Sequence, residues 1–176
     1  MGRSLTWTHP VRLQDVARAP VKVRLEPDAA TRAQLAKDLG VQGFPSLSAE
    51  LTVRPWLDGA EIAGRFSGVV EQICGVSLEP FEQQISGEVE VRVVPPGSSS
   101  APPEPEGGEI ELDLEAPDPP DVLDSDVVDL AAYLVEHLAL AIDPFPRRPG
   151  AEFTYTPDPE VESPFAILKR LKGDEG

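Results

Sequence analysis

Cys74 is the residue whose type could most readily do chemistry, and it is the only cysteine in the chain. A cysteine acts as a nucleophile or a metal ligand through its thiolate, which requires a base, a cation or a metal beside it. Both histidines, His9 and His137, lie far from it in the sequence. We therefore predict a buried structural cysteine at a strand end, because unpaired cysteines mostly pack as small hydrophobic side chains. We expect no catalytic residue, no metal site and no cofactor.

The rest of the chain offers no other pattern that is typical of an enzyme. It has no glycine-rich phosphate loop, no Gly-x-Ser-x-Gly turn and no Asp-x-Asp-x-Asp-Gly calcium loop. A reaction needs a nucleophile, a base or a metal that is held by oriented partners. The sequence therefore predicts a protein that is not an enzyme and has no small-molecule substrate.

Two small cationic clusters are best suited to contact a partner. One closes the chain, where Ser163 can cap a helix, Pro164 fits its first turn and Phe165 begins an apolar face. The cationic side chains are Lys169, Arg170 and Lys172 at the end of this predicted helix, and Arg147 and Arg148 between two prolines. They could bind RNA or protein. Alternatively, the terminal cations stabilise the helix dipole, and the arginine pair binds neighbouring acids.

The charge is unevenly distributed along the chain, which has a formal net charge of −16. Residues 95–162 hold 17 acidic and 2 basic side chains, whereas residues 1–94 hold 12 acidic and 10 basic ones. Such a chain is unsuited to binding RNA over its whole surface, because binding requires Lys and Arg to neutralise phosphates. The acidic segment either is a solvated stretch or binds a basic partner.

The elements that must position these residues are predicted from periodicity. Alternating apolar and polar residues predict strands at 21–25, 47–55, 61–74 and 81–94, a short β-prone segment at 5–9, and a further strand that 109–115 can add. Asp28 and Gly40 bound a helix over 29–39. A second helix begins at Asp126, places Leu130, Leu134 and Leu138 on one face, and stops at Pro144.

Consecutive strands with short connections predict an α+β fold: an antiparallel β-meander or a partly closed barrel, with two or three packed helices and a disordered acidic Pro-rich loop. We expect a single domain in three parts. Residues 1–94 form the sheet with one helix, residues 95–120 form a flexible acidic Pro/Ser-rich insert, and residues 121–176 complete the domain with helices.

Three segments together resemble the YceD family, the large ribosomal RNA subunit accumulation proteins. They are residues 72–80 (QICGVSLEP), residues 128–147, which open on Val-Asp-Leu, and residues 163–172 (SPFAILKRLK). The positions that carry the resemblance are Cys74, Leu78, Asp129, Leu130, Pro164 and Phe165. Many members of the family have a Cys-x-x-Cys pair at the first segment. Here position 77 is Ser, which argues against a metal or redox role for this turn.

The resemblance implies a non-enzymatic role in the synthesis, processing or accumulation of large-subunit ribosomal RNA. The expected partner is precursor ribosomal RNA or a large-subunit ribosomal protein. The alternative is an acidic protein-interaction module, or a chaperone for a basic ribosomal protein, that does not contact RNA. Because the N-terminus lacks the apolar core of a signal peptide and no apolar run is long enough to span a bilayer, we expect a cytoplasmic protein without a membrane contact. The resemblance implies that this protein is bacterial.

Overall fold

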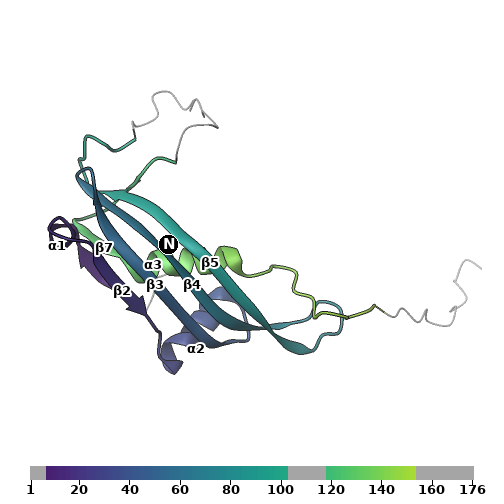
Figure 1. The fold of residues 1–176 in the computed structure, drawn as a ribbon. Coiled ribbons are helices and arrows are strands. Elements are labelled where there is room, and N and C mark those ends of the chain that lie inside the picture. Colours follow the sequence, from purple (N-terminus) through teal and green to yellow (C-terminus); the bar gives the residue numbers. More distant parts are fainter. Residues whose placement is uncertain (1–6, 103–117, 154–176) are drawn as a thin grey trace, which may run out of the picture.

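The fold is built on a twisted sheet of five strands (Figure 1). The computed structural model describes residues 7–102 and 118–153. The strands of this sheet, in spatial order, are β2 (Val21–Leu25), β3 (Gly43–Trp56), β4 (Gly59–Ile73), β5 (Pro80–Val94) and β6 (Asp121–Val122). The first four pair antiparallel, and β6 pairs with β5 in parallel. The sheet is therefore an open meander, as the alternating pattern predicted, with an added parallel edge strand.

Strict alternation gives the sheet one apolar face. Leu51 pairs with Val23 on one side and Gly64 on the other, and Val53 pairs with Val21 and Ile62, so these rows share a face. The side chains on this face are buried, and they include Ala49, Leu51, Val53, Ile62, Phe66, Val70, Ile85, Val89 and Val93. The other face carries polar and charged residues. A sheet with one apolar face must be covered on that face alone.

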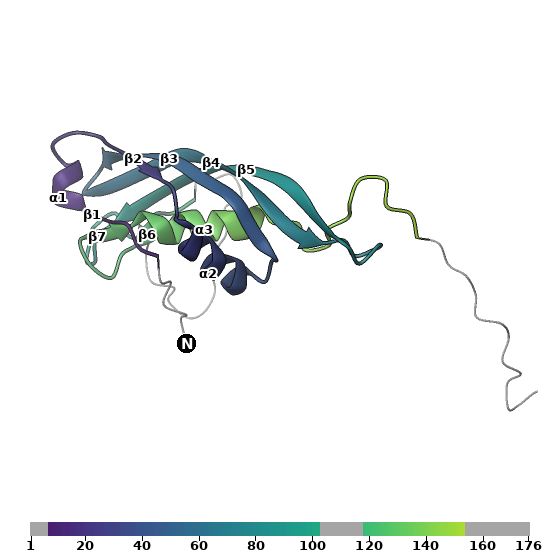
Figure 2. The same ribbon diagram turned by 90° about the horizontal axis from the view of Figure 1, so that it is seen from below.

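Helices α2 (Ala29–Leu39) and α3 (Leu130–Ala141) cover the apolar face, and Figure 2 shows both on the same side of the sheet. The Asp28 side chain caps α2 by accepting a hydrogen bond from the Thr31 N–H at 2.7 Å. Gly40 ends it in the left-handed conformation, with φ of 72°. Both boundaries confirm the sequence prediction, and each satisfies backbone groups that a helix end would otherwise leave unpaired.

The start of α3 corrects the prediction of a helix from Asp126. Residues Val127–Asp129 form strand β7, which pairs antiparallel with β1 (Pro10–Arg12) and is followed at once by α3. The β-prone segment expected at 5–9 was therefore placed too early. Of that segment, residues 7–9 are described and belong to no strand. Strand β1 is followed directly in the sequence by a short helix, α1 (Leu13–Val16).

Asp129 ties this second pair of strands to α3. Its carboxylate accepts hydrogen bonds from the Ala131 N–H at 3.1 Å and from the His9 N–H at 2.7 Å. The carbonyl of His9 in turn accepts the Leu130 N–H at 3.0 Å. Asp129 is thus both the cap of α3 and the anchor of the N-terminal segment, which explains why the helix starts here.

Several predicted segments lie wholly or partly outside the described residues. These are the strand at 109–115, the central part (103–117) of the acidic Pro-rich insert, and the terminal helix at 163–172. The described parts of the insert, residues 95–102 and 118–120, contain neither helix nor strand. No helix within the described ranges is both long and apolar enough to cross a membrane.

Replacing Asp129 with alanine should lower the free energy of unfolding by about 1–2 kcal/mol, because it removes a helix cap and leaves the His9 N–H without its acceptor. Asp129→Asn should retain most of the stability, since asparagine is also a good cap. Urea denaturation measures both variants. An Asp129→Ala variant as stable as the parent would contradict the anchoring role.

Candidate functional site

The turn between β4 and β5 carries the cysteine-centred motif. It runs from Cys74 to Glu79 and is closed by two backbone hydrogen bonds, from Cys74 N–H to Glu79 O and from Leu78 N–H to Cys74 O, both 2.9 Å. Leu78 adopts φ of 59°, in the left-handed region that a leucine seldom occupies. Its side chain is 76% exposed. The turn therefore holds a strained residue whose apolar side chain faces solvent.

The segment that follows α3 passes beside this turn (Figures 1 and 2). The buried amide of Gln72 donates to the Asp143 carbonyl at 2.9 Å, and the Gly75 N–H donates to the Pro146 carbonyl at 2.9 Å. The Arg148 N–H reaches the sulfur of Cys74 at 3.4 Å. We call residues 72–79 and 143–148 together the clasp. The clasp brings together two of the three sequence segments that carry the family resemblance, residues 72–80 and 128–147.

The sulfur of Cys74 is the centre of the clasp. Its side chain is 0% exposed, and the sulfur accepts three backbone N–H groups at 3.4 Å, those of Val76, Ser77 and Arg148. The prediction of a buried cysteine at a strand end is confirmed. The sulfur does more than fill space, however, because it connects the turn to a residue 74 positions away.

Hydrogen bonds lower the pKa of Cys74 to about 6. The largest contribution is the side-chain hydroxyl of Ser77, followed by the N–H groups of Ser77 and Arg148, and burial opposes them. The Ser77 oxygen is buried and makes no hydrogen bond of good geometry with another described group. A thiolate would provide the acceptor that this hydroxyl lacks. The N–H groups around the sulfur thus favour the thiolate over the thiol, and burial opposes them.

Arg148 and Arg147 have different roles in the clasp. The Arg148 guanidinium pairs with the Glu79 carboxylate at 2.9 Å, as expected for an arginine beside acids, but the pair is half exposed and adds little stability. Arg147 is exposed and makes no ion pair with any described residue. The neighbouring Phe145 is 79% exposed, while its N–H is held by the Asp143 carboxylate at 2.8 Å. Among the described residues, the clasp therefore presents Arg147 as an unpaired cation, together with the exposed apolar side chains of Leu78 and Phe145.

The other predicted site residues are placed elsewhere. Asp129 and Leu130 lie at the start of α3, where they cap and pack the helix, and Leu130 is fully buried. His137 is partly exposed, and its ring nitrogen contacts the Tyr133 carbonyl at 2.8 Å. Pro164, Phe165, Lys169, Arg170 and Lys172 lie outside the described residues. Within the described ranges, no three His, Cys, Asp or Glu side chains come together as metal ligands.

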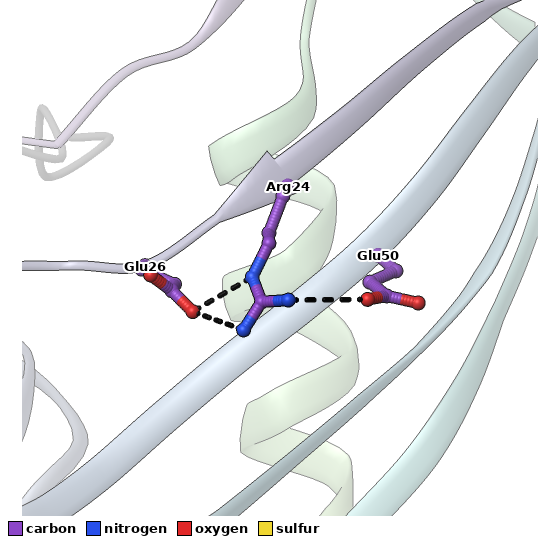
Figure 3. Close-up of polar contacts among 3 residues, drawn as sticks. All are labelled: Arg24, Glu26 and Glu50. Atoms are coloured by element: carbon purple, nitrogen blue, oxygen red, sulfur yellow. Dashed lines mark hydrogen bonds and ion pairs between the residues drawn. The ribbon is translucent and has the colours of Figure 1, made fainter.

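A separate charged cluster lies on the open face of the sheet (Figure 3). Arg24 on β2 donates to the Glu26 carboxylate at 2.7 Å and lies 3.5 Å from Glu50 on β3. The hydrogen bond to Glu26 raises the pKa of Arg24. All three side chains are more than half exposed. Such pairs contribute little to stability, so this cluster is a solvated surface rather than a site.

Sequence reasoning missed the joining of the two clasp segments. One signal was available, because Gln72 continues the apolar row of Phe66 and Val70 and is 5% exposed. A polar side chain at a buried position requires a hydrogen-bond partner, and that partner proved to be the backbone after α3. Nothing local identified which segment would supply it.

The lowered pKa of Cys74 predicts a pH-dependent stability. Unfolding restores the ordinary value of 9.0, so the unfolded state binds more protons between about pH 6 and pH 9. The stabilisation by Cys74 should be full above pH 9 and be lost as pH falls through 6. The difference in unfolding free energy between the parent and Cys74→Ala should therefore be larger at pH 9 than at pH 5. Urea denaturation measures it, and an unchanged difference would refute the anionic sulfur.

Comparison with known proteins identifies the family. Residues 62–172 match the family described as "Large ribosomal RNA subunit accumulation protein YceD", a span that covers more than half of the chain and both segments of the clasp. No curated protein matches this chain, and no solved structure does. The matched span begins in β4 and includes the Cys74 turn, α3 and the arginine pair. The chain belongs to the YceD family, the large ribosomal RNA subunit accumulation proteins.

Proposed function

We propose that this chain is a non-enzymatic, cytoplasmic factor that supports the synthesis, processing or accumulation of large-subunit ribosomal RNA by binding. The family description supports a role in the accumulation of this RNA. The partner that we propose is precursor ribosomal RNA or a large-subunit ribosomal protein. The binding surface is the clasp, together with the terminal segment at 163–172.

The environment of Cys74 supports binding rather than catalysis. Its sulfur is 0% exposed, so a substrate cannot reach it without opening the clasp. Its hydrogen-bond donors are the backbone N–H groups of Val76, Ser77 and Arg148, and neither histidine is among them. A sulfur held this way has no access path for a substrate, which nucleophilic catalysis needs. The sulfur is better suited to fix the shape of the clasp.

The observation that carries the proposal is that the clasp fixes Arg147, Leu78 and Phe145 on one rigid backbone while leaving their side chains exposed. Exposed apolar side chains beside an arginine are typical of contact surfaces, where aromatic residues and arginines contribute most of the binding energy. Because the backbone is already ordered by the sulfur, binding costs less conformational entropy.

The net charge of −16 restricts how RNA can be contacted. Over most of the surface, carboxylates repel phosphate, so an RNA contact must be local to the few free cations. Arg147 is one of these, and the sequence places three more, Lys169, Arg170 and Lys172, in the terminal segment. The same acidic surface also favours a second function, the binding of a basic ribosomal protein without any RNA contact.

Replacing Arg147 with glutamate should reduce mature large-subunit ribosomal RNA in a strain that depends on this protein, because it places a repulsive charge at the proposed contact. Stability should change by less than about 0.5 kcal/mol, since the side chain is exposed and unpaired among the described residues. The matched control is Arg18→Glu, the same charge reversal at an exposed arginine just beyond α1. RNA levels are measured relative to the small-subunit RNA.

Full rescue by Arg147→Glu, or an equal defect in Arg18→Glu, would refute the clasp as the contact surface. A deletion of residues 163–176 tests the terminal segment in the same strain. Affinity purification with and without ribonuclease then separates the two candidate functions, because an RNA-mediated association is lost on digestion whereas a direct protein contact persists.

A further inference from the structure

Among the residues that the structure describes, most of the outer edge of β5 pairs with no strand. Strand β5 pairs with β4 from Pro80 to Val93, but β6 pairs with its other edge only at Val93 and Val94. Within the described ranges, residues 80–92 therefore have no strand on that side. An unpaired edge presents a row of backbone N–H and C=O groups and is a template for an added strand.

The pairing with β6 shows which residues point toward the free side. The Leu123 N–H donates to the Val94 carbonyl at 2.9 Å, so Val94 directs its backbone groups toward β6. Backbone groups alternate between the two edges of a strand. The backbone N–H and C=O groups of even-numbered β5 residues therefore point toward the free edge, and those of odd-numbered residues bond to β4. Between Pro80 and Val94 the outward residues are Glu82, Gln84, Ser86, Glu88, Glu90 and Arg92.

A groove of about 710 Å³ lies along this edge just before β6. It is lined by Glu90, Val91, Arg92, Asp118, Pro119 and Asp121. The charge of its one cation is already compensated, because the Arg92 guanidinium lies 3.5 Å from the Glu61 carboxylate and 5.4 Å from the centre of the Trp56 ring. The groove therefore combines three carboxylates with free backbone groups.

Strand β6 shows that this edge already accepts an extended segment. Its residue Asp121 lies near Tyr133 of α3, since burial, followed by the charge of this carboxylate, raises the pKa of Tyr133. The short strand thus lies beside α3 as well as β5. Strand β6 therefore marks the end of the unpaired stretch of β5, at Val93.

We propose that the free edge of β5 is the docking site for an extended, Lys/Arg-bearing segment of a partner protein, which adds as a further strand. This inference rests on the proposed function and names the chemistry of its protein partner. The occupant is argued from charge, because Glu82, Glu88 and Glu90 on β5 join Asp118 and Asp121 beside the edge. Cations on the added strand would lie opposite these carboxylates.

The same charges disfavour two other occupants. The chain's own segment 109–115 alternates apolar residues with Glu109, Glu111, Asp113 and Glu115, and like charges would face each other across the new pair. RNA would place its phosphates against the carboxylates and has no backbone that completes a β-ladder. A basic polypeptide can both neutralise these carboxylates and form hydrogen bonds with the free backbone groups of β5.

The test uses the whole chain and a short synthetic peptide of alternating lysine and valine. Amide hydrogen exchange, followed by NMR, should show that the peptide protects the N–H groups of Ser86, Glu88 and Glu90, which exchange freely without it. Residues that bond to β4, such as Val89, should be protected with and without the peptide. A peptide of the same sequence with N-methylated alternate amides should bind at least about tenfold more weakly, because it cannot complete the ladder.

Glu88→Pro removes one outward N–H while leaving the bonds to β4, and proline is tolerated on edge strands. It should weaken peptide binding by about fivefold more than Glu88→Gln, which removes only the charge. If the N-methylated peptide binds equally well, the contact is electrostatic and the added strand is wrong. If the outward amides are already protected in the free protein, the chain itself occupies the edge and the proposal is likewise wrong.

Failure here is distinguishable from failure of the proposed function. The peptide experiment measures only the β5 edge, whereas Arg147→Glu and its control measure RNA accumulation through the clasp. A protein that binds no basic peptide yet loses function with Arg147→Glu would overturn the edge proposal alone.

Discussion

Burial of a single face of the sheet is the constraint from which the rest of the structure follows. The alternation in β3, β4 and β5 directs one apolar row toward α2 and α3, where Leu134 and Leu138 are fully buried. Each such side chain contributes about 1.5–3 kcal/mol of hydrophobic stabilisation. Because α2 and α3 lie on that face, the described part of the chain leaves the opposite face and the β5 edge available for contacts.

The position of α3 also determines where the chain goes next. Asp129 fixes its start beside β1, and its 12 residues carry the chain about 18 Å along the sheet. The chain therefore emerges near the β4–β5 turn, where Gln72 and the Cys74 sulfur bind it. In this sense the clasp depends on the packing of the helix. Loss of that packing would separate the two segments even if each kept its local conformation.

The sequence was sufficient to predict the features that depend on local patterns. The four main strands, the capped helix from Asp28 to Gly40 and the burial of Cys74 all follow from alternation, capping chemistry and the ordinary behaviour of a lone cysteine. The start of α3 was misplaced because Val127 fits both a helical stripe and a strand, and Asp126 and Asp129 are both plausible caps. The choice between a helix and a strand at Val127 depends on the pairing of β7 with β1, and these two strands are far apart in the sequence.

The candidate site could be predicted only in its parts. Cys74 and the arginine pair were identified separately, but the hydrogen bond between Arg148 and the sulfur spans 74 positions and has no local signature. The parallel strand β6 was missed for the same reason, since two residues are too few to show a period. Long-range pairing of this kind is set by the packed core, and not by the propensities of the segments that it joins.

The chain belongs to the YceD family, and the role that we propose for it is binding, with a sulfur-centred clasp that holds a few side chains exposed toward a ribosomal partner. The most direct measurement is site-specific photo-crosslinking in growing cells from position 147, with position 18 as the reference and with identification of both the RNA and the protein attached. The account predicts precursor large-subunit ribosomal RNA or a large-subunit ribosomal protein at position 147 and neither at position 18. Products without any ribosomal component, or the same products from both positions, would contradict it.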